Sequence, residues 1–283
     1  MLWERTEPTA VMPAWDDYVA FRRRALHRMA DLAGLDRVDE CGMVGAVAPT
    51  GPGRGGVLVV EPGVHDALFE VLHRGLPQWV GLLHPDPRTL GRLVAEGWDA
   101  VQQHHAMSLA DLDRLRPARM PAGVTPVEVA VRPGGQGFPL ATALEVELEH
   151  SRDDIAAPAR DLELEARLLR ELSVRFFAAV DDKGACVGTA GSRVVDSSAL
   201  VAAVVTVPAH RRRGVGTAMT CRALEAARED GAVDGFLDAT PAGVGIGANR
   251  AWSAPSSRSA RTTSTAYAPS SRPIVARLRP CSR

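Results

Sequence analysis

Three consecutive arginines, Arg211–Arg213, stand directly before two glycines, Gly214 and Gly216, in the stretch TVPAHRRRGVGTAMT (206–220). Glycine lets the backbone approach a ligand closely and adopt positive φ where that is required. The backbone N–H groups of residues 212–217 then point out of a first helical turn, where no intrahelical acceptor exists. The helix dipole favours an anion at the same place. The spacing therefore predicts a phosphate site, and the loop suits a pyrophosphate.

Other interpretations of this loop compete with the phosphate site. A charged, solvated turn is the simplest, because a G-x-G beside arginines is common. A Rossmann dinucleotide site is disfavoured, because G-x-G-x-x-G is incomplete and the preceding strands do not form a βαβ unit. A P-loop is excluded, because no G-K-[ST] is present. Nucleic-acid binding through the arginines is disfavoured by the net charge of −1 and by the absence of interleaved aromatic residues.

The longer stretch VVTVPAHRRRGVGTAMTCRALEAAREDGAVDGFLDAT (204–240) resembles the acetyl-coenzyme A binding core of the GNAT-type N-acetyltransferase superfamily. The family pattern is an apolar strand ending V-x-P, then [QR]-x-x-G-x-[GA], an amphipathic helix, a glycine and a buried strand. The matching residues are Val205–Pro208, Arg211, Gly214, Gly216, the helix to Asp230, Gly231 and Phe236–Ala239.

The resemblance implies an acyl-CoA N-acyltransferase fold with acetyl-CoA as the co-substrate. It implies that the N–H groups of residues 212–217 hold the pyrophosphate, and that the backbone of Val205 and Val207 pairs with the pantetheine like an added strand. The thioester carbonyl would lie where this strand splays from its neighbour, polarised by a backbone N–H. The implied cofactor-binding residues are Val205, Thr206, Val207, Arg211, Arg212, Arg213, Gly214, Val215, Gly216 and Thr217.

The catalytic residues are not assigned by the sequence. Glu147 and Glu149 are candidates for a base that acts through water, because they lie near where the family's fold places its acceptor-binding helices; a solvated helix face is the default interpretation of them. The family often uses a tyrosine to protonate the departing thiolate. That tyrosine is expected just after Ile246, where Gly247 stands instead. No spacing of metal ligands is present, so we expect no metal.

Alternating and helical patterns place the loop inside an α/β (α+β) fold with a mixed, mostly antiparallel central sheet flanked by helices. Three strands joined by tight polar turns form an antiparallel meander directly before the loop. The predicted strands of this half are 127–132, 174–180, 185–195, 200–207 and 235–240, and the predicted helices are 138–149, 161–172 and 217–230.

The first half has a similar pattern. The stretch WVGLLHPDPRTLGRLVAEGW (79–98) resembles the last β-α-β portion of a GNAT domain, but no R-x-x-G-x-G precedes it. GPGRGG (51–56) precedes a strand and is typical of a hairpin turn. The expectation is a duplicated fold whose first domain does not bind coenzyme A; an unrelated α/β cap domain is the alternative. The predicted helices are 16–33, 64–73 and 87–98, and the predicted strands are 41–48, 57–61, 79–84 and 104–109.

The last 33 residues, 251–283, contain no Asp, Glu, Gly or Lys and show no helical or strand periodicity, which predicts disorder. Two explanations remain for the departure from the family pattern after Ile246. Either the domain is a genuine variant with a disordered tail, or the reading frame shifts near Ile246 or Gly247; the abrupt change of composition favours the frameshift. Either way, the second sheet would lose its last strand and keep an unpaired edge. The predicted division is 1–112 for the degenerate GNAT-like or cap domain, 113–126 for a linker, 127–250 for the acetyltransferase domain and 251–283 for the tail.

Composition limits the cellular context. A hydrophobic fraction of 46% supports a globular core. The sequence has no apolar run of about 18 residues or more, so we expect no membrane-spanning helix. The N-terminus lacks the apolar segment of a secretory signal. The four cysteines form no C-x-x-C pair, which fits a reducing cytoplasm. We therefore expect a cytoplasmic N-acetyltransferase acting on an unidentified small-molecule or peptide amine, with no membrane or nucleic-acid partner. An impaired or inactive coenzyme A-binding remnant is the alternative, and the oligomeric state is not predicted.

Overall fold

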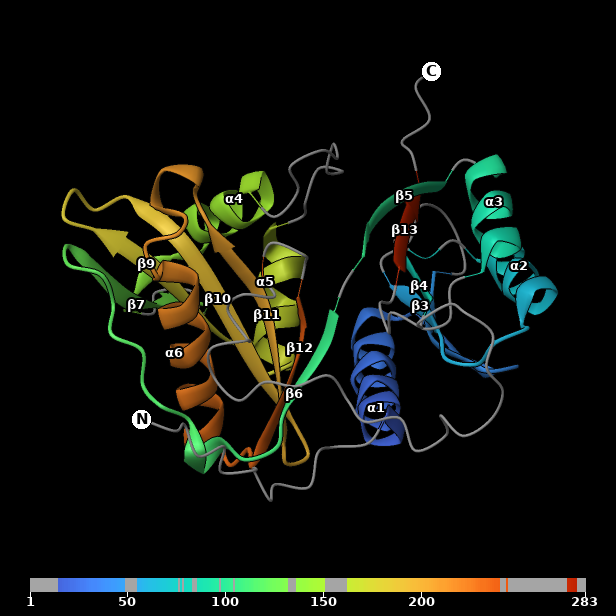
Figure 1. Cartoon of the computed structure of the whole chain (residues 1–283), viewed down its shortest axis with the longest axis horizontal. Helices are drawn as coiled ribbons and strands as arrows, with labels where there is room; N and C mark the ends of the chain where they lie inside the picture. Colours follow the sequence, from blue (N-terminus) through green and yellow to red (C-terminus); the bar gives the residue numbers. More distant parts are fainter. Residues whose placement is uncertain are drawn as a thin grey trace, which may run out of the picture.

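A computed structural model describes residues 15–48, 55–75, 77, 79–82, 86–96, 98–103, 105–131, 136–150, 162–239, 243 and 274–278. The chain forms two sheets side by side, with helix α1 between them (Figure 1). The elements of the first half are α1 (Trp15–Ala33), β1 (Asp36–Glu40), β2 (Met43–Val47), β3 (Gly56–Val59), α2 (His65–Arg74), β4 (Trp79–Leu82), α3 (Pro87–Ala95) and β5 (Trp98–Gln103). Those that follow are β6 (His105–Leu109), η1 (Leu112–Arg114), β7 (Val124–Ala130), β8 (Phe138–Pro139), α4 (Leu140–His150), α5 (Leu162–Glu171), β9 (Arg175–Asp181), β10 (Cys186–Val195), β11 (Ser198–Thr206), η2 (Pro208–His210), α6 (Val215–Glu229), β12 (Asp234–Ala239) and β13 (Ile274–Leu278).

Both sheets are mixed and mostly antiparallel, as the sequence predicts. The first has the strand order β1-β2-β3-β4-β13-β5, and the second has the order β6-β12-β11-β10-β9-β7-β8. The predicted meander is confirmed, because β10 pairs antiparallel with both β9 and β11. The predicted helices are present within a few residues of their expected ends, whereas β1, β5 and β8 were not predicted.

Helices cover the second sheet on two faces. Helix α6 packs on one face through small residues, since alanines and Met219 lie in one core cluster with Phe177, Val201 and Leu237. Side chains alternate between the faces of a strand, so Phe176 and Ala178 point the other way. There they pack with Ala143 and Leu144 of α4. The second sheet is therefore covered by α6 on one face and by α4 on the other.

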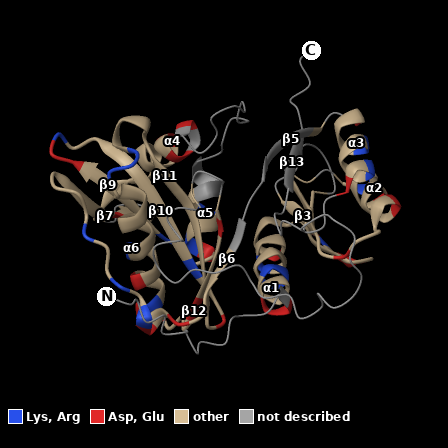
Figure 2. Ribbon diagram, in the orientation of Figure 1, with Lys and Arg blue, Asp and Glu red and all other residues tan. Residues whose placement is uncertain are grey.

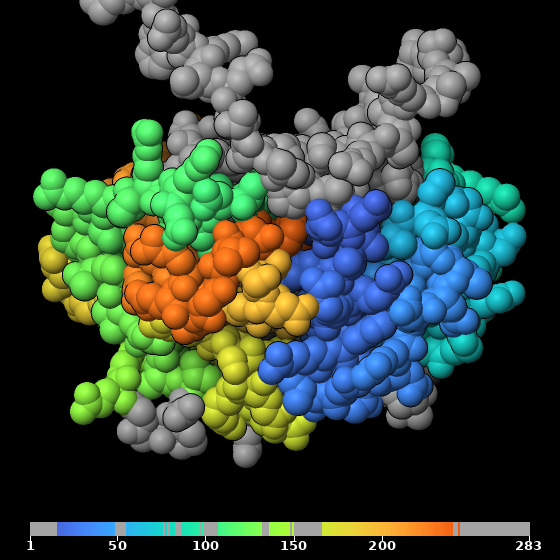
Figure 3. All heavy atoms as spheres, turned by 90° about the horizontal axis from the view of Figure 1, so that it is seen from below, coloured from blue at the N-terminus to red at the C-terminus, as the bar shows by residue number. Residues whose placement is uncertain are grey.

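Helix α1 joins the halves. Its residues Tyr18 and Phe21 are buried against Val44 and Leu58 of the first sheet and against Phe236 of the second. The Phe21 and Phe236 rings are stacked with centroids 4.9 Å apart. Seen from below, the blue atoms of the N-terminal part adjoin the yellow and orange atoms of the second half (Figure 3). One apolar cluster therefore spans both sheets.

The edge that was expected to be unpaired on the second sheet is covered. Strand β6 pairs antiparallel with β12, from Leu109 opposite Gly235 to His105 opposite Ala239. The prediction of a free edge is therefore wrong. The strand that closes this edge precedes the predicted linker in the chain, and Figure 1 shows the chain crossing from β5 in one half to β6 in the other.

The expectation that residues 251–283 hold no strand is wrong for Ile274–Leu278. This segment forms β13, which lies between β4 and β5 and pairs antiparallel with both. Its sequence IVARL is rich in β-branched and apolar residues, which favour a strand. A five-residue segment is not stable as a strand by itself, and here β4 and β5 supply hydrogen-bonded partners on both sides. The frameshift near Ile246 or Gly247 stays a hypothesis, because residues 244–273 lie outside the described part. The domain boundaries also stay predictions; residues 115–123 of the expected linker are irregular, and β7 begins at Val124.

Candidate functional site

Strands β11 and β12 are paired over only part of their lengths. Parallel pairing runs from Ser198 opposite Asp234 to Val201 opposite Leu237. Strand β11 then continues to Thr206 beside β10, while β12 continues to Ala239 beside β6. Beyond Val201 the two central strands therefore have no ladder between them. This opening in the sheet is the splay that the sequence resemblance implies, and its backbone groups can pair with an extended ligand.

A β-bulge lies at the start of the splay. Thr189 of β10 is opposite Val205, and Gly191 is opposite Ala202, so two β11 residues, Ala203 and Val204, face one residue of β10. Ala203 has φ of +53°, which is unusual for a residue with a side chain. The buried Thr189 hydroxyl donates to the Ala203 carbonyl at 2.8 Å. A bulge leaves backbone groups out of the ladder, so this one provides polar groups where a thioester carbonyl would lie.

The loop after β11 is held by its own backbone and by Arg211. The Arg211 Nε donates to the Thr206 carbonyl at 3.0 Å, and the N–H of Arg211 donates to the Pro208 carbonyl. Arg212 has φ of +63° and Gly214 has φ of +91°, so the chain turns sharply into α6. Only Gly214 of the two predicted glycines uses positive φ; Gly216 lies within the first turn of the helix.

The start of α6 presents unpaired N–H groups. The N–H of Ala218 is the first with a helical acceptor, the Gly214 carbonyl at 3.0 Å; among the described residues, no backbone acceptor is recorded for the N–H groups of 212–217. Val215 is buried and anchors the turn in the core, while the side chains of Arg211–Arg213 are exposed. The predicted residues therefore form one cradle at a helix N-terminus, where an anion is favoured.

Two residues of the predicted set, Val207 and Val205, direct their backbone groups differently from the prediction. The N–H of Val207 donates to the Val187 carbonyl at 3.0 Å, and the Val207 carbonyl accepts from the N–H of His210 at 2.9 Å. Both polar groups of Val207 therefore have partners within the fold, and the prediction that they pair with pantetheine is corrected. Because backbone groups alternate in direction along a strand, the N–H of Thr206 points away from β10, toward the splay, while its carbonyl accepts from Arg211. Val205, which lies opposite Thr189, directs its backbone groups toward β10 as Val207 does, so its predicted pairing with pantetheine is corrected too.

The candidate base residues lie on the opposite face of the sheet from α6. Helix α4, which carries Glu147 and Glu149, packs against β10 and β11. Glu147 is half-buried and Glu149 is exposed. Their catalytic function stays a prediction.

A buried polar cluster beside the splay was not predicted from the sequence. Asp238, one residue beyond the last β11–β12 pair, accepts a hydrogen bond from the Tyr18 hydroxyl at 2.7 Å. The guanidinium of Arg22 donates to its other oxygen, also at 2.7 Å. Burial first, and then the negative charge of Asp238, raise the pKa of Tyr18 well above its usual value. The cluster joins α1 to β12, and only the alternation of the strand gave a signal for Asp238.

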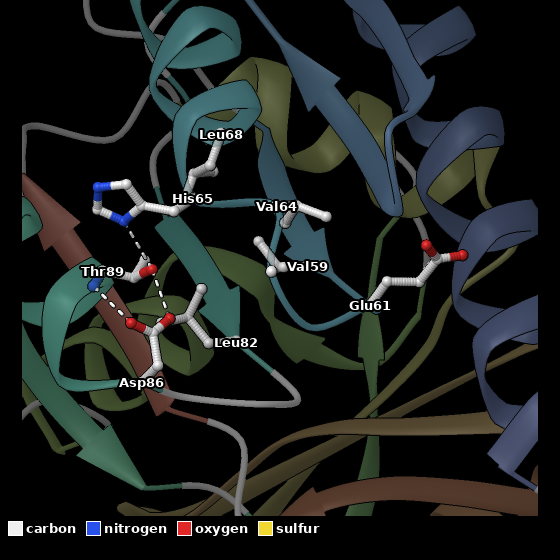
Figure 4. A pocket seen from close by; sticks show the side chains of 9 residues that line it. Val59, Glu61, Val64, His65, Leu68, Leu82, Asp86 and Thr89 are labelled. Atoms are coloured by element: carbon white, nitrogen blue, oxygen red, sulfur yellow. Dashed lines mark hydrogen bonds between the residues drawn. The ribbon is translucent and has the colours of Figure 1, made fainter.

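The first half contains a related strand–helix–strand unit without the splay. Strand β3 and strand β4, which flank α2, are parallel and paired along their whole length, from Gly56 opposite Trp79 to Val59 opposite Leu82. Beyond these strands, Thr89 accepts a hydrogen bond from His65 and donates one to Asp86 (Figure 4). Asp86 is the N-cap of α3 and also accepts from the Thr89 N–H, so its carboxylate is connected to His65, the first residue of α2, only through Thr89.

The described residues contain no group of three or more His, Cys, Asp or Glu that could hold a metal ion. A membrane-crossing helix is also absent from them, because no described helix is both long and apolar enough.

Comparison with known proteins supports the geometry. No curated protein sequence matches the chain. A GCN5-related N-acetyltransferase from Kribbella flavida has a similar structure, with 18% identity, a TM-score of 0.56, and coverage of 92% of this chain and 95% of that chain. A Drosophila protein is 11% identical with a TM-score of 0.52, over 94% of this chain and 91% of that chain. These likenesses show a shared fold. Residues 139–244, which contain the splay, the loop and α6, match the acetyltransferase (GNAT) family and form a domain of that family.

Proposed function

We propose that the protein is an acetyl-CoA-dependent N-acetyltransferase that moves the acetyl group directly from the thioester to an acceptor amine. The observation that carries the proposal is that β11, which within the described residues is unpaired with β12 beyond Val201, leads directly into the loop that presents N–H groups at the start of α6. The pyrophosphate would bind the N–H groups of residues 212–217. The pantetheine would extend along β11 beside Thr206, with its thioester at the bulge.

The transfer requires three things of the protein. A neutral amine must attack the thioester carbonyl, the developing oxyanion must be stabilised, and the departing sulfur must receive a proton. Backbone N–H groups at the bulge of Ala203 and Val204 would stabilise the oxyanion. Glu147 or Glu149 would accept the proton of the amine through water. Helix α6 covers one face of the sheet, so the amine would approach from the other face.

The first half is proposed not to bind acetyl-CoA. Its parallel strands β3 and β4 are paired throughout, and the segment before α2 has no R-x-x-G-x-G. The carboxylate of Asp86, which is linked through Thr89 to His65 at the start of α2, would also disfavour a phosphate there. Burial alone would raise the pKa of Asp86, but hydrogen bonds from the Thr89 side chain and backbone lower it below its usual value. The group is therefore anionic at neutral pH.

Isothermal titration with acetyl-CoA tests the proposal. We expect saturable heat with one acetyl-CoA per chain, and a weaker signal for the Gly216→Leu variant, whose side chain would project near the cradle. No heat at high micromolar ligand would exclude both the enzyme and the coenzyme A-binding remnant. Two molecules per chain would contradict the assignment of the first half.

A thiol-release assay then separates an enzyme from a remnant. Amines of different chemistry are added to the protein and acetyl-CoA, and free thiol is measured over time. Release that depends on an amine supports the transferase. Binding of acetyl-CoA without release for any amine supports the alternative, an impaired or inactive coenzyme A-binding protein.

A further inference from the structure

The splay between β11 and β12 is closed at one end. Its closed end is the last pair of the parallel ladder, Val201 opposite Leu237. A ligand that lies between the two strands and pairs with them like an added strand stops at this pair, because from there on the strands are hydrogen-bonded to each other. At its other end, β11 leads into the loop before α6. A ligand held by this loop therefore extends toward the closed end.

Only a short stretch of strand separates the bulge from the closed end. Ala203, at the bulge, is two residues from Val201, and two residues of a strand span about 7 Å. In the proposed function the thioester carbonyl lies at the bulge, so the acyl chain of the donor extends from there toward Val201 and Leu237. An acetyl group adds one methyl group along this stretch, whereas an extended octanoyl chain is longer than the stretch.

The face of the sheet under α6 gives a longer chain no way out. The side chains of Val201 and Leu237 are both buried there, in the core cluster that includes Met219 and Ala223 of α6. Protein cores are packed so densely that extra methylene groups enter only when side chains or backbone move. A longer acyl chain can therefore turn toward α6 only if one of these side chains is made smaller.

The opposite face is polar at the same level. Asp238 directly follows Leu237, so its side chain points to that other face. There its carboxylate accepts hydrogen bonds from Tyr18 and Arg22 of α1, whose basic segments lie between the two sheets (Figure 2). An apolar chain turned to this face would remove water from an ion pair that is already partly desolvated, which is costly. It would also occupy the face from which the amine is proposed to approach.

We propose that the closed end of the splay limits the acyl group of the donor to a short chain such as acetyl, and that Leu237 sets this limit. The proposal rests on the proposed acetyltransferase function, because it names the class of acyl donor that the same site takes. In a site without such a limit, each further methylene group buried in the sheet would strengthen binding about 4-fold. The closed end reverses this trend, so medium-chain acyl-CoA is excluded.

Isothermal titration of the full chain with two CoA thioesters tests the limit without catalysis. Acetyl-CoA and octanoyl-CoA are titrated under the same conditions. We expect octanoyl-CoA to bind at least about 10-fold more weakly than acetyl-CoA, because its chain reaches the closed end and forces the packed side chains apart. A smaller decrease, equal affinity or tighter binding of octanoyl-CoA would overturn the proposal.

The variant Leu237→Ala tests which side chain sets the limit. It leaves an empty volume at the closed end, so it should raise the affinity for octanoyl-CoA relative to acetyl-CoA by at least about 10-fold. Leu237→Val, a smaller truncation, should change this ratio less and in the same direction, and it replaces the alanine variant if that variant does not fold. An unchanged ratio would overturn the role of Leu237.

Leu224→Ala is the matched control. Leu224 is also buried in the cluster under α6, but it packs beside Gly235, two residues before Leu237 and within the paired part of β12. Its truncation should lower the stability of the protein and leave the ratio of the two affinities unchanged. An equal change of the ratio in Leu224→Ala and Leu237→Ala would show a general loosening of the core and would also overturn the role of Leu237.

The two proposals fail in different ways. If neither thioester binds, the transferase function is wrong, and the limit on the acyl chain is wrong with it. If octanoyl-CoA binds as well as acetyl-CoA and an amine still releases thiol from acetyl-CoA, the function stands and the limit is wrong.

Discussion

The substitution Asp238→Asn tests the cluster that joins the two halves. It keeps the size of the side chain but removes the negative charge that Arg22 and Tyr18 contact at 2.7 Å. The side chains of Arg22 and Asp238 are only 14% and 23% exposed, so water screens the charge of Arg22 poorly once its partner is neutral. Breaking a fully buried pair costs about 3–5 kcal/mol. The partial exposure reduces the expected loss in the free energy of unfolding to about 2–3 kcal/mol.

Urea unfolding followed by tryptophan fluorescence measures the effect. Tyr18→Phe should cost about 1.5–3 kcal/mol, because it removes one hydrogen bond to a charged acceptor. Asp196→Asn is the matched control: Arg24 and Asp196 are also in contact, but their side chains are 46% and 66% exposed. An exposed pair contributes about 0–1 kcal/mol, so the control should change the midpoint little.

A double-mutant cycle isolates the pair. Arg22→Met removes the cation, and the combined variant Arg22→Met with Asp238→Asn should be more stable than the sum of the two single losses predicts. The reasoning would be refuted if Asp238→Asn cost no more than Asp196→Asn. Additive losses in the cycle would also refute it, because they would show that Arg22 and Asp238 stabilise the fold independently.

Three further substitutions test the loop, the bulge and the last strand. Gly214→Ala should lower the free energy of unfolding by about 1–2 kcal/mol, because φ is +91° there. The control Gly216→Ala lies within the helix and should raise the free energy of unfolding by up to about 1 kcal/mol, measured by urea unfolding; a loss of stability in both variants would contradict this explanation. Thr189→Val leaves the Ala203 carbonyl without its hydroxyl donor, so it should lower the free energy of unfolding by about 1–3 kcal/mol and lower kcat more than KM. Thr189→Ser should recover both the stability and kcat; a Ser variant as impaired as the Val variant would show that packing of the Thr189 methyl group matters instead. A chain ending at residue 273 lacks β13, so hydrogen exchange should lose protection at Trp79–Leu82 and keep it in β12; unchanged protection of β4 would contradict the pairing.

The loop and its helix were predictable because their signal is local. The residues from Val205 to Gly216 are contiguous, and glycine, arginine and the helical pattern after them restrict the backbone within a few positions. The same holds for the meander, whose tight turns fix its antiparallel pairing. Where the local prediction failed, as for Val207, the cause was a partner on another strand, the Val187 carbonyl.

The strand partners were not predictable because they are distant in the chain. The pattern of residues 104–109 predicted a strand, but nothing in it identifies β12 as the neighbour. Strand β13 is only five residues long and takes its stability from β4 and β5. The contact of Tyr18 with Asp238 likewise depends on how α1 packs between the sheets.

The pairing of β6 and the packing of α1 give the first half a role that does not require coenzyme A. Beyond Leu237, β12 has no ladder with β11, so the wall of the splay at Asp238 and Ala239 is held by β6 on its edge and by α1 on its face. An isolated strand end would fray. A sheet that must open between two central strands needs support on the outer strand, and here that support comes from elements that precede the family-matched segment. This is why we expect Asp238→Asn to weaken the proposed acetyl transfer as well as stability, even though the residue lies outside the loop proposed to bind the pyrophosphate.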